Sequence, residues 1–172
     1  MIEFINIILG EFPEEFNVKE AREKYPNLKS ESMNTVLVQE LVKFNLLIGL
    51  VRNSLTDIKR ALEGLIILSF ELEEAAHYLS LGKVPSMWNK ISYATLKPLG
   101  GYIKNLIERV KFFSKWVENG KPNEFWLGGF YSAQGFITGV LQNYARRYQI
   151  AIDELQYDME VRIISIFLKF FR

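Results

Sequence analysis

Three neighbouring residues have the types and the spacing of a metal site. Glu73 and Glu74 precede His77, and a glutamate with a histidine three residues later lies on one face of a helix. Helical bundles that hold two metal ions use two such pairs together with two further carboxylates. The chain has His 1, so a second pair does not exist. We therefore expect a solvated helix face with a local Glu and His pair, and no metal site.

The sequence also lacks the patterns that mark nucleophiles and phosphate-binding loops. Neither Ser80 nor Ser132 stands in the G-x-S-x-G pattern of a serine hydrolase. Two glycine pairs lack the Lys and Ser or Thr that complete a phosphate loop, and these pairs are Gly100–Gly101, before Tyr102, and Gly128–Gly129, before Phe130. Cys 0 excludes thiolate nucleophiles and cysteine-bound zinc. We expect no catalytic, cofactor-binding or metal-binding residues and no cofactor. An unmarked pair of Asp or Glu residues acting as acid and base is the remaining enzyme hypothesis.

Aromatic and basic residues occur together near position 145. Residues of these types stack on single-stranded nucleic acid, and here they are Tyr144, Arg146, Arg147 and Tyr148. The whole protein has Lys+Arg 21 against Asp+Glu 20, so its net charge of +1 provides no general attraction for nucleic acid. We interpret the four residues as a helix end with core tyrosines, and expect no nucleic-acid partner.

A second group of aromatic residues is more typical of a core or a docking surface than of a cofactor site. The group comprises Phe112, Phe113, Trp116, Phe125, Trp126, Phe130 and Tyr131. Together with broad apolar helix faces, it provides more apolar surface than one small bundle readily buries. The sequence therefore predicts an exposed interaction surface.

Length and composition indicate one folded domain. The 172 residues are 49% hydrophobic and 24% charged, which is too apolar and too evenly charged for intrinsic disorder. The first ten residues carry Glu3 and no basic segment, so we expect no secretory signal, and the absence of cysteine fits the cytoplasm. The apolar windows Val36–Val51 and Ile163–Phe171 are interrupted by Glu40 and Lys43 or are too short for a bilayer. We expect no membrane-spanning segment and no membrane partner.

Apolar residues at alternating steps of four and three indicate a long amphipathic helix. The stripe consists of Leu37, Leu41, Phe44, Ile48, Val51, Leu55, Ile58, Leu62 and Leu65. The same phase resumes after residue 69 and stops before Gly82 and Pro85. We expect one long helix with a weak point; the alternative is two nearly collinear helices broken near Asn53, Ser54 and Thr56, whose side chains compete for backbone hydrogen bonds. The width of the stripe favours packing in a bundle over a free dimeric coiled coil.

Three further helices are expected. Asn17 and Glu20 form a capping box for a short helix over Val18–Lys24. Pro98 opens a second helix, which Gly120 ends. A third helix follows the Gly128–Gly129 turn and carries apolar residues at helical spacing up to position 148.

The pattern changes to a two-residue alternation from Leu155 to Ile163, which predicts a β-strand. A helix stays open as the alternative, because Leu155, Met159 and Ile163 would also share a helix face. No other stretch alternates comparably. The expected fold class is therefore mainly α, a bundle of long amphipathic helices with a possible C-terminal β-strand whose sheet partners are missing.

Several stretches, in order along the sequence, resemble the C-terminal region of dynein heavy chains. They are SESMNTVLVQE at Ser30–Glu40, KVPSMW at Lys83–Trp88, LKPLG at Leu96–Gly100, FWLGGF at Phe125–Phe130 and GVLQNYAR at Gly139–Arg146. The sequences of the segments Met33–Gln39 and Gln142–Arg146 are similar to those of axonemal rather than cytoplasmic dyneins. The resemblance covers roughly Ile8 to Val161 and stops there. We expect residues 1–160 to be part of the C-terminal helical domain of a dynein heavy chain, and residues 161–172 to be a divergent apolar tail.

The resemblance implies a place in a microtubule motor. In that family the helical domain follows the sixth AAA+ module and lies against the ring, while ATP is hydrolysed in earlier modules and microtubules are gripped at a separate stalk. The protein would then be a non-catalytic part that braces the ring in the cytoskeleton of a cilium or flagellum axoneme. Its partners would be the remainder of the heavy chain and other dynein subunits, with microtubules reached only through the parent motor.

The residues expected to carry this role are structural: the Leu37 to Leu65 stripe, Trp88, Trp116, Trp126 and Tyr144. Their broad apolar faces would pack on a neighbouring module and transmit its movement through a stiff contact. An independent helical adaptor that binds partner helices is the alternative function.

Overall fold

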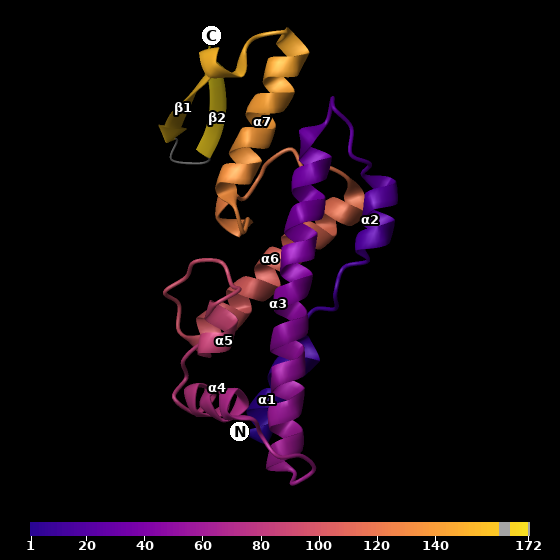
Figure 1. Ribbon diagram of the computed structural model, residues 1–172. Helices are drawn as coiled ribbons and strands as arrows, with labels where there is room; N and C mark the ends of the chain where they lie inside the picture. The colour runs from indigo at the N-terminus through magenta and orange to yellow at the C-terminus, as the bar shows by residue number, and fades with distance from the viewer. Residues whose placement is uncertain (162–165, 172) are drawn as a thin grey trace.

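The computed structural model describes residues 1–161 and 166–171, and helices dominate it (Figure 1). The α-helices are α1 (Ile2–Glu11), α2 (Val18–Lys24), α3 (Ser32–Leu62), α4 (Phe70–Ser80), α5 (Ser86–Asn89), α6 (Leu99–Asn119) and α7 (Ala133–Tyr148). Two short 3-10 helices, η1 (Leu127–Gly129) and η2 (Ile152–Glu154), precede and follow α7, and the strands β1 (Gln156–Val161) and β2 (Ile166–Phe171) come last. The mainly α fold expected from the sequence is confirmed.

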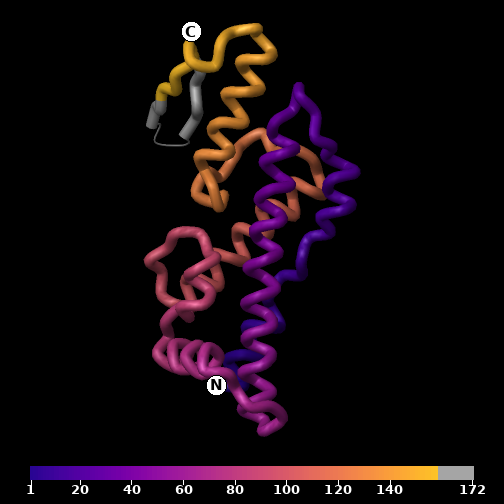
Figure 2. Tube along the Cα trace, in the orientation of Figure 1, coloured from indigo at the N-terminus to yellow at the C-terminus, as the bar shows by residue number. Residues whose placement is uncertain are grey.

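α3 is the axis of the molecule. Figures 1 and 2 show α1 and α4 beside its C-terminal part and α2 and α7 beside its N-terminal part, and all four helices contact it. Its length and hydropathy alone would allow it to cross a membrane, as is also true of core helices in folded domains. Here the stripe from Leu37 to Ile58 is buried by neighbouring helices. The helix therefore organises an internal core.

The single helix expected across residues 37–79 is wrong, and so is the alternative break near residue 54. The hydroxyls of Ser54 and Thr56 donate to carbonyl oxygens three and four residues earlier, at 3.0 and 2.8 Å, and α3 continues past them. It ends instead at Leu62, and Gly64, two residues later, has φ +76°. The amide of Leu65 donates to the carbonyl of Arg60 at 2.9 Å, which completes a Schellman ending, and Ser69 then caps α4.

The helices expected at Val18, Pro98 and position 133 are confirmed. Pro98 is the N-cap of α6, and Gly120 ends that helix with φ +92°. The hydroxyl of Ser132 caps α7 by accepting the amide of Gly135 at 3.2 Å. The helices expected from the sequence do not include α1, which buries Ile5 and Ile8 in the core.

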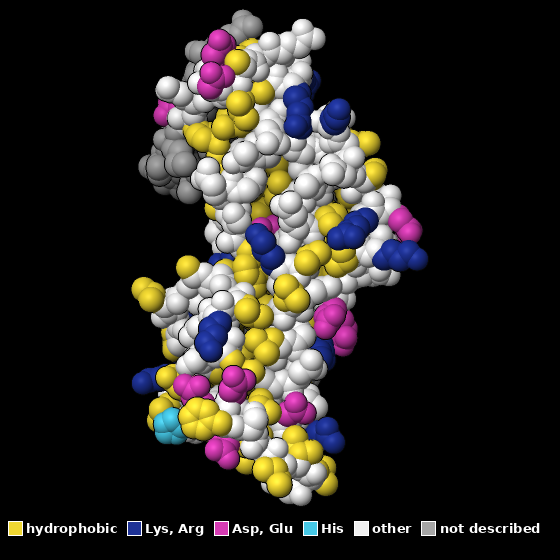
Figure 3. All heavy atoms as spheres, viewed as in Figure 1, with side chains coloured by type: hydrophobic (Ala, Val, Ile, Leu, Met, Phe, Trp, Pro, Cys, Tyr) yellow, Lys and Arg dark blue, Asp and Glu magenta, His cyan; other side chains and the backbone are white. Residues whose placement is uncertain are grey.

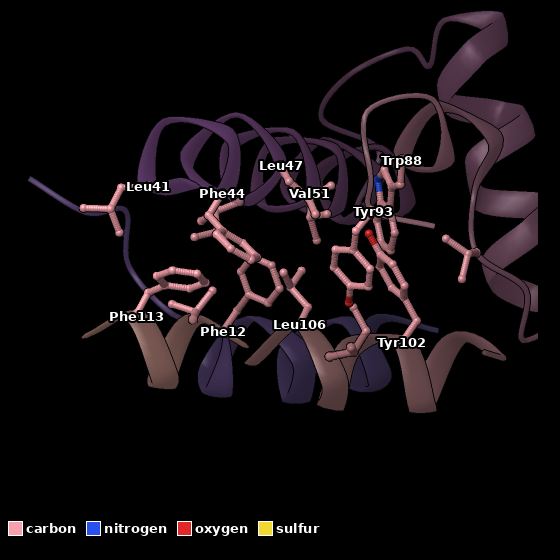
Figure 4. Close-up of a cluster of buried hydrophobic side chains, with 14 of the residues drawn as sticks. Phe12, Leu41, Phe44, Leu47, Val51, Trp88, Tyr93, Tyr102, Leu106 and Phe113 are labelled. Carbon is pink, nitrogen blue, oxygen red and sulfur yellow. The ribbon is translucent and has the colours of Figure 1, made fainter. Parts of the chain in front are cut away.

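Aromatic rings fill the space between α3 and α6. In Figure 4, Phe44 of α3 and Phe113 of α6 lie together, and their ring centroids are 5.2 Å apart. The ring of Trp116 stacks on Phe113, and further along Trp88 lies beside Tyr102. The indole of Trp88 donates to the Ser54 hydroxyl at 2.9 Å, so the buried Ser54 links α3 to α5. The core is thus aromatic along much of its length.

The predicted strand is confirmed, and the protein itself supplies one neighbour for it. β1 pairs antiparallel with β2, from Gln156 opposite Phe171 to Val161 opposite Ile166. This corrects the expectation that its sheet partners are missing, although among the described residues no third strand joins the sheet. β2 is an almost continuous apolar run, so it lacks the alternation that reveals a half-buried strand. The expected strand end, Ile163, lies outside the described residues.

The crossing of α7 over α3 generates the first prediction. A Cβ atom at Gly139 would lie 2.5 Å from Met33 Cε and 2.9 Å from Val36 Cγ2. We expect Gly139→Ala to lower the free energy of unfolding by about 1–3 kcal/mol, because the two helices must move apart or repack. Urea denaturation followed by circular dichroism measures this change.

Gly10→Ala is the matched control. Gly10 also lies in a helix, but nothing is within 4 Å of a Cβ atom built there. Alanine should raise stability there by roughly 0.5–1 kcal/mol. Equal effects of the two substitutions would contradict a close approach at Gly139.

Candidate interaction surface and its internal support

A buried carboxylate of α3 holds the start of α7. The side chain of Glu40 is 2% exposed, and its two oxygens accept the amides of Tyr131 at 2.5 Å and Ser132 at 3.2 Å. Burial raises the pKa of Glu40, while these two amides and the charges of Lys43 and Arg109 act in the opposite direction. The carboxylate of Glu40 therefore accepts the hydrogen bonds that water would otherwise accept from the amides at the N-terminus of α7.

A buried arginine of α6 holds the same junction from the other side. The guanidinium of Arg109 donates to the carbonyl of Phe130 at 3.2 Å and to Asn105 at 2.9 Å. It also lies 3.6 Å from the centre of the Tyr93 ring, a close cation–π contact. Burial lowers the pKa of Arg109, although the charge of Glu40 acts against this. We call Glu40 and Arg109 the polar clamp, because together they bind three consecutive backbone groups, at residues 130 to 132.

Three tyrosines surround the polar clamp. Burial raises the pKa of Tyr102 to about 12 and raises that of Tyr93 and Tyr131 further, so all three are neutral at physiological pH. Tyr102 donates to Ser92, Tyr131 donates to the carbonyl of Ile91, and Tyr93 stacks on Tyr102. These contacts fix the loop before α6 to the clamp and give the cluster a structural task.

The residues with metal-site spacing do not converge. Glu73, Glu74 and His77 lie on α4, and Glu74 accepts a hydrogen bond from Ser86 at 3.3 Å. Among residues 1–161 and 166–171, no three His, Cys, Asp or Glu side chains are grouped so as to hold a metal ion. The candidate nucleophiles serve helix ends: Ser80 donates to the carbonyl of His77, and Ser132 caps α7.

The basic and aromatic residues at the end of α7 are brought together. One nitrogen of Arg146, Nη1, donates to the carbonyl of Lys29 at 2.6 Å and to the hydroxyl of Ser32 at 2.7 Å, which fastens α7 to the start of α3. The rings of Tyr144 and Tyr148 lie 4.4 Å apart. They line a groove with Arg147, so this cluster is more than a helix end.

Most residues expected to contact a neighbouring module instead form the core. The stripe is fully buried from Leu37 to Ile58, and Trp88 and Trp116 are 0% and 2% exposed. Trp126 is 39% exposed and lies against Gly129, where a Cβ atom would be 2.8 Å from its ring. Of the residues expected to contact a neighbouring module, mainly Leu62 and Leu65 at the end of the stripe and Trp126 are therefore exposed enough to do so.

An exposed apolar group lies where α3 turns into α4. It consists of Leu62, Leu65, Ile67 and Phe70, and we call it the apolar tip. Ile67 is 96% and Phe70 81% exposed, and Figure 3 shows hydrophobic side chains gathered at this end of the molecule. An apolar run interrupted by Glu63 and Gly64 is the feature of the sequence that could have indicated this exposed group. The heptad pattern instead assigns Leu62 and Leu65 to the core. Exposed groups of this kind mark interaction sites.

Sequence comparison relates the protein to the C-terminal part of dynein heavy chains. A family model for the C-terminal domain of the dynein heavy chain matches residues 1–165. Dynein axonemal heavy chain 3 of Mus musculus is 51% identical over 154 residues, which are 90% of this sequence and 4% of that protein. Dynein axonemal heavy chain 12 of Mus musculus is 47% identical over 161 residues, 94% of this sequence and 5% of that protein. Dynein axonemal heavy chain 1 of Rattus norvegicus is 42% identical over 154 residues, 90% of this sequence and 3% of that protein.

The polar clamp predicts a dependence of stability on pH. Because the pKa of Glu40 is higher in the folded than in the unfolded protein, the folded state binds this proton more tightly. The resulting stabilisation is complete below the unfolded pKa and is lost as the pH rises through the folded pKa. As the pH rises, the free energy of unfolding of the wild type should therefore fall relative to that of Glu40→Gln. Urea denaturation of both proteins between about pH 4 and 8 measures this difference. A difference that stays constant with pH would contradict the prediction.

Proposed function

Because the protein belongs to the family formed by the C-terminal domains of dynein heavy chains, we propose that it is a non-catalytic brace of an axonemal dynein motor. It spans about 3 to 5% of the length of the relatives described above, so the remainder of the heavy chain is its first partner. We propose residues 1–160 as the helical domain and residues 161–172 as a divergent extension, although this boundary falls within β1. The proposed location is the cytoplasm and the axoneme of a cilium or flagellum, as part of its cytoskeleton.

The observation that carries the proposal is a stiff rod with an exposed apolar end. From Glu40 in the polar clamp to Leu62 in the apolar tip, α3 extends about 33 Å at the rise of an α-helix. Buried side chains recur along this length from Leu41 to Ile58, so bending the rod would disturb a close-packed core. A push on the apolar tip is therefore passed along α3 to the clamp and α7.

In the proposed mechanism, the apolar tip docks on a module of the motor ring. Removing its four large apolar side chains from water would stabilise the contact, at roughly 25 cal/mol per Å² of apolar surface buried. Movement of that module would then shift the whole rod, since α3 lacks a hinge between Ser32 and Leu62. ATP hydrolysis and microtubule binding belong, in this proposal, to other parts of the heavy chain.

The independent helical adaptor is the second candidate. The exposed apolar tip would suit it equally, because such a patch can receive a partner helix. The test compares two affinities of the isolated protein: one for unrelated amphipathic helices and one for the segment of a dynein heavy chain that precedes this domain. Equal affinities would favour the adaptor over the brace.

A direct prediction concerns nucleotide turnover. We expect the purified protein to hydrolyse ATP no faster than buffer, because no phosphate loop occurs in its sequence. A coupled phosphate-release assay measures this rate. Turnover that copurifies with the protein through successive columns would contradict the non-catalytic assignment.

A second prediction tests the apolar tip. In a heavy chain that carries this domain, Ile67→Glu combined with Phe70→Glu should weaken docking, because two carboxylates would be desolvated in the contact. We expect faster proteolysis at the α3–α4 turn and altered microtubule gliding speed. The isolated domain should stay within about 0.5 kcal/mol of wild type per surface change.

Leu46→Glu is the matched control, because Leu46, like Ile67 and Phe70, is a large exposed apolar residue, 64% exposed, but it lies in the middle of α3. It should leave gliding speed and proteolysis unchanged. If the tip variant behaves like wild type in both assays, the apolar tip does not brace the motor.

A further inference from the structure

A groove lies at the end of the molecule opposite the apolar tip. The last turns of α7, the start of α3 with the residues just before it, and the segment between α6 and η1 line an open groove of about 550 Å³. Figure 1 shows α7 beside the N-terminal end of α3, where these segments meet. Met33, Phe125 and Val140 give the groove an apolar floor, and this volume is in the range of known ligand sites.

The rim of the groove has an excess of positive charge. Lys121, Arg146 and Arg147 line it together with a single carboxylate, Glu31. That carboxylate is already engaged: it accepts from Asn143 at 2.7 Å and pairs with Lys121 at 3.4 Å. Three cations against one anion leave a net charge of about +2, enough to attract one or two further carboxylates.

Arg147 is the cation best placed for a ligand. It is exposed, and its described contact is with the ring of Tyr148, 5.7 Å from the guanidinium to the ring centre. Arg146, in contrast, already uses Nη1 to hold Lys29 and Ser32. A guanidinium over an aromatic ring still presents its N–H edge to a carboxylate.

We propose that this groove binds an acidic peptide segment of a partner protein. An apolar side chain of the segment occupies the floor formed by Met33, Phe125 and Val140, and flanking carboxylates face Arg147 and Lys121. The inference goes beyond the proposed bracing role and does not rest on it, since α3 separates the groove from the apolar tip.

The chemistry of the groove favours a peptide over single-stranded nucleic acid. Nucleic-acid sites neutralise a series of phosphates, whereas here Glu31 lies among only three cations. The protein as a whole has a net charge of +1, which adds no long-range attraction. An apolar floor with a short basic rim matches one anchor residue between acidic neighbours.

The test uses fluorescence anisotropy with the full protein. The probe is a short fluorescein-labelled peptide in which one phenylalanine is flanked by glutamates. We expect saturable binding that weakens as NaCl is raised. A peptide with lysines in place of the glutamates should not bind, and a peptide with serine in place of the phenylalanine should bind more weakly.

Two variants of the protein locate the site. Arg147→Glu should weaken binding by about tenfold, because an attraction becomes a repulsion at close range. Lys104→Glu changes the net charge equally but lies in the groove between α1 and α6, so it should leave the affinity within about twofold. Circular dichroism verifies that both variants are folded, and Lys121→Gln provides a second, milder change in the rim.

Several results would overturn the proposal. Absence of saturable binding, equal binding of the lysine peptide, or unchanged affinity in both Arg147→Glu and Lys121→Gln would each do so. Tighter binding of labelled oligothymidine, sensitive to Arg147→Glu, would assign the groove to nucleic acid instead. None of these outcomes would affect the ATP and gliding tests of the bracing role, so the two hypotheses fail separately.

Discussion

The grip of two buried side chains on the backbone at residues 130 to 132 is the constraint on which the arrangement of the helices depends. Glu40 comes from α3 and Arg109 from α6, and between them they engage two amides and a carbonyl at the start of α7. A buried ionised group is costly unless it is paired and hydrogen-bonded, so both side chains are committed to these partners. The clamp thus fixes where α7 begins, while Gly139 allows it to cross α3 closely.

The internal core uses most of the apolar surface that the sequence offers. The long stripe, Trp88 and Trp116 meet α1, α5 and α6 rather than a neighbouring module. Two surfaces lie at the two ends of α3: an exposed apolar tip at the turn into α4 and a basic groove beside α7. A rod that presents different chemistry at its two ends is suited to connecting two partners, and the proposed functions follow from this division.

Side chains that suggest chemistry in the sequence are used here for structure. Ser80 and Ser132 satisfy backbone groups at helix ends, and Arg146 joins α7 to the start of α3. Helix termini leave unpaired amides and carbonyls, and hydroxyls and guanidiniums are well suited to meet that need. A domain of seven α-helices, counted over residues 1–161 and 166–171, has many such ends, and many of its polar side chains form hydrogen bonds there.

The sequence by itself determined the helical class, the helix starts at Asn17 and Pro98 and the resemblance to the family, and it favoured a strand after Leu155, because these depend on local spacing and on short motifs. Only the tertiary structure decided that α3 continues through Ser54, whose hydroxyl has a partner in Trp88 on α5. It also decided that Glu40 is buried and that Ile67 is exposed, since burial depends on which distant segments pack together. The tertiary structure also decided that β1 pairs with β2. The alternation of a single strand is visible in the sequence, but which strand pairs with it depends on contacts that the alternation does not encode.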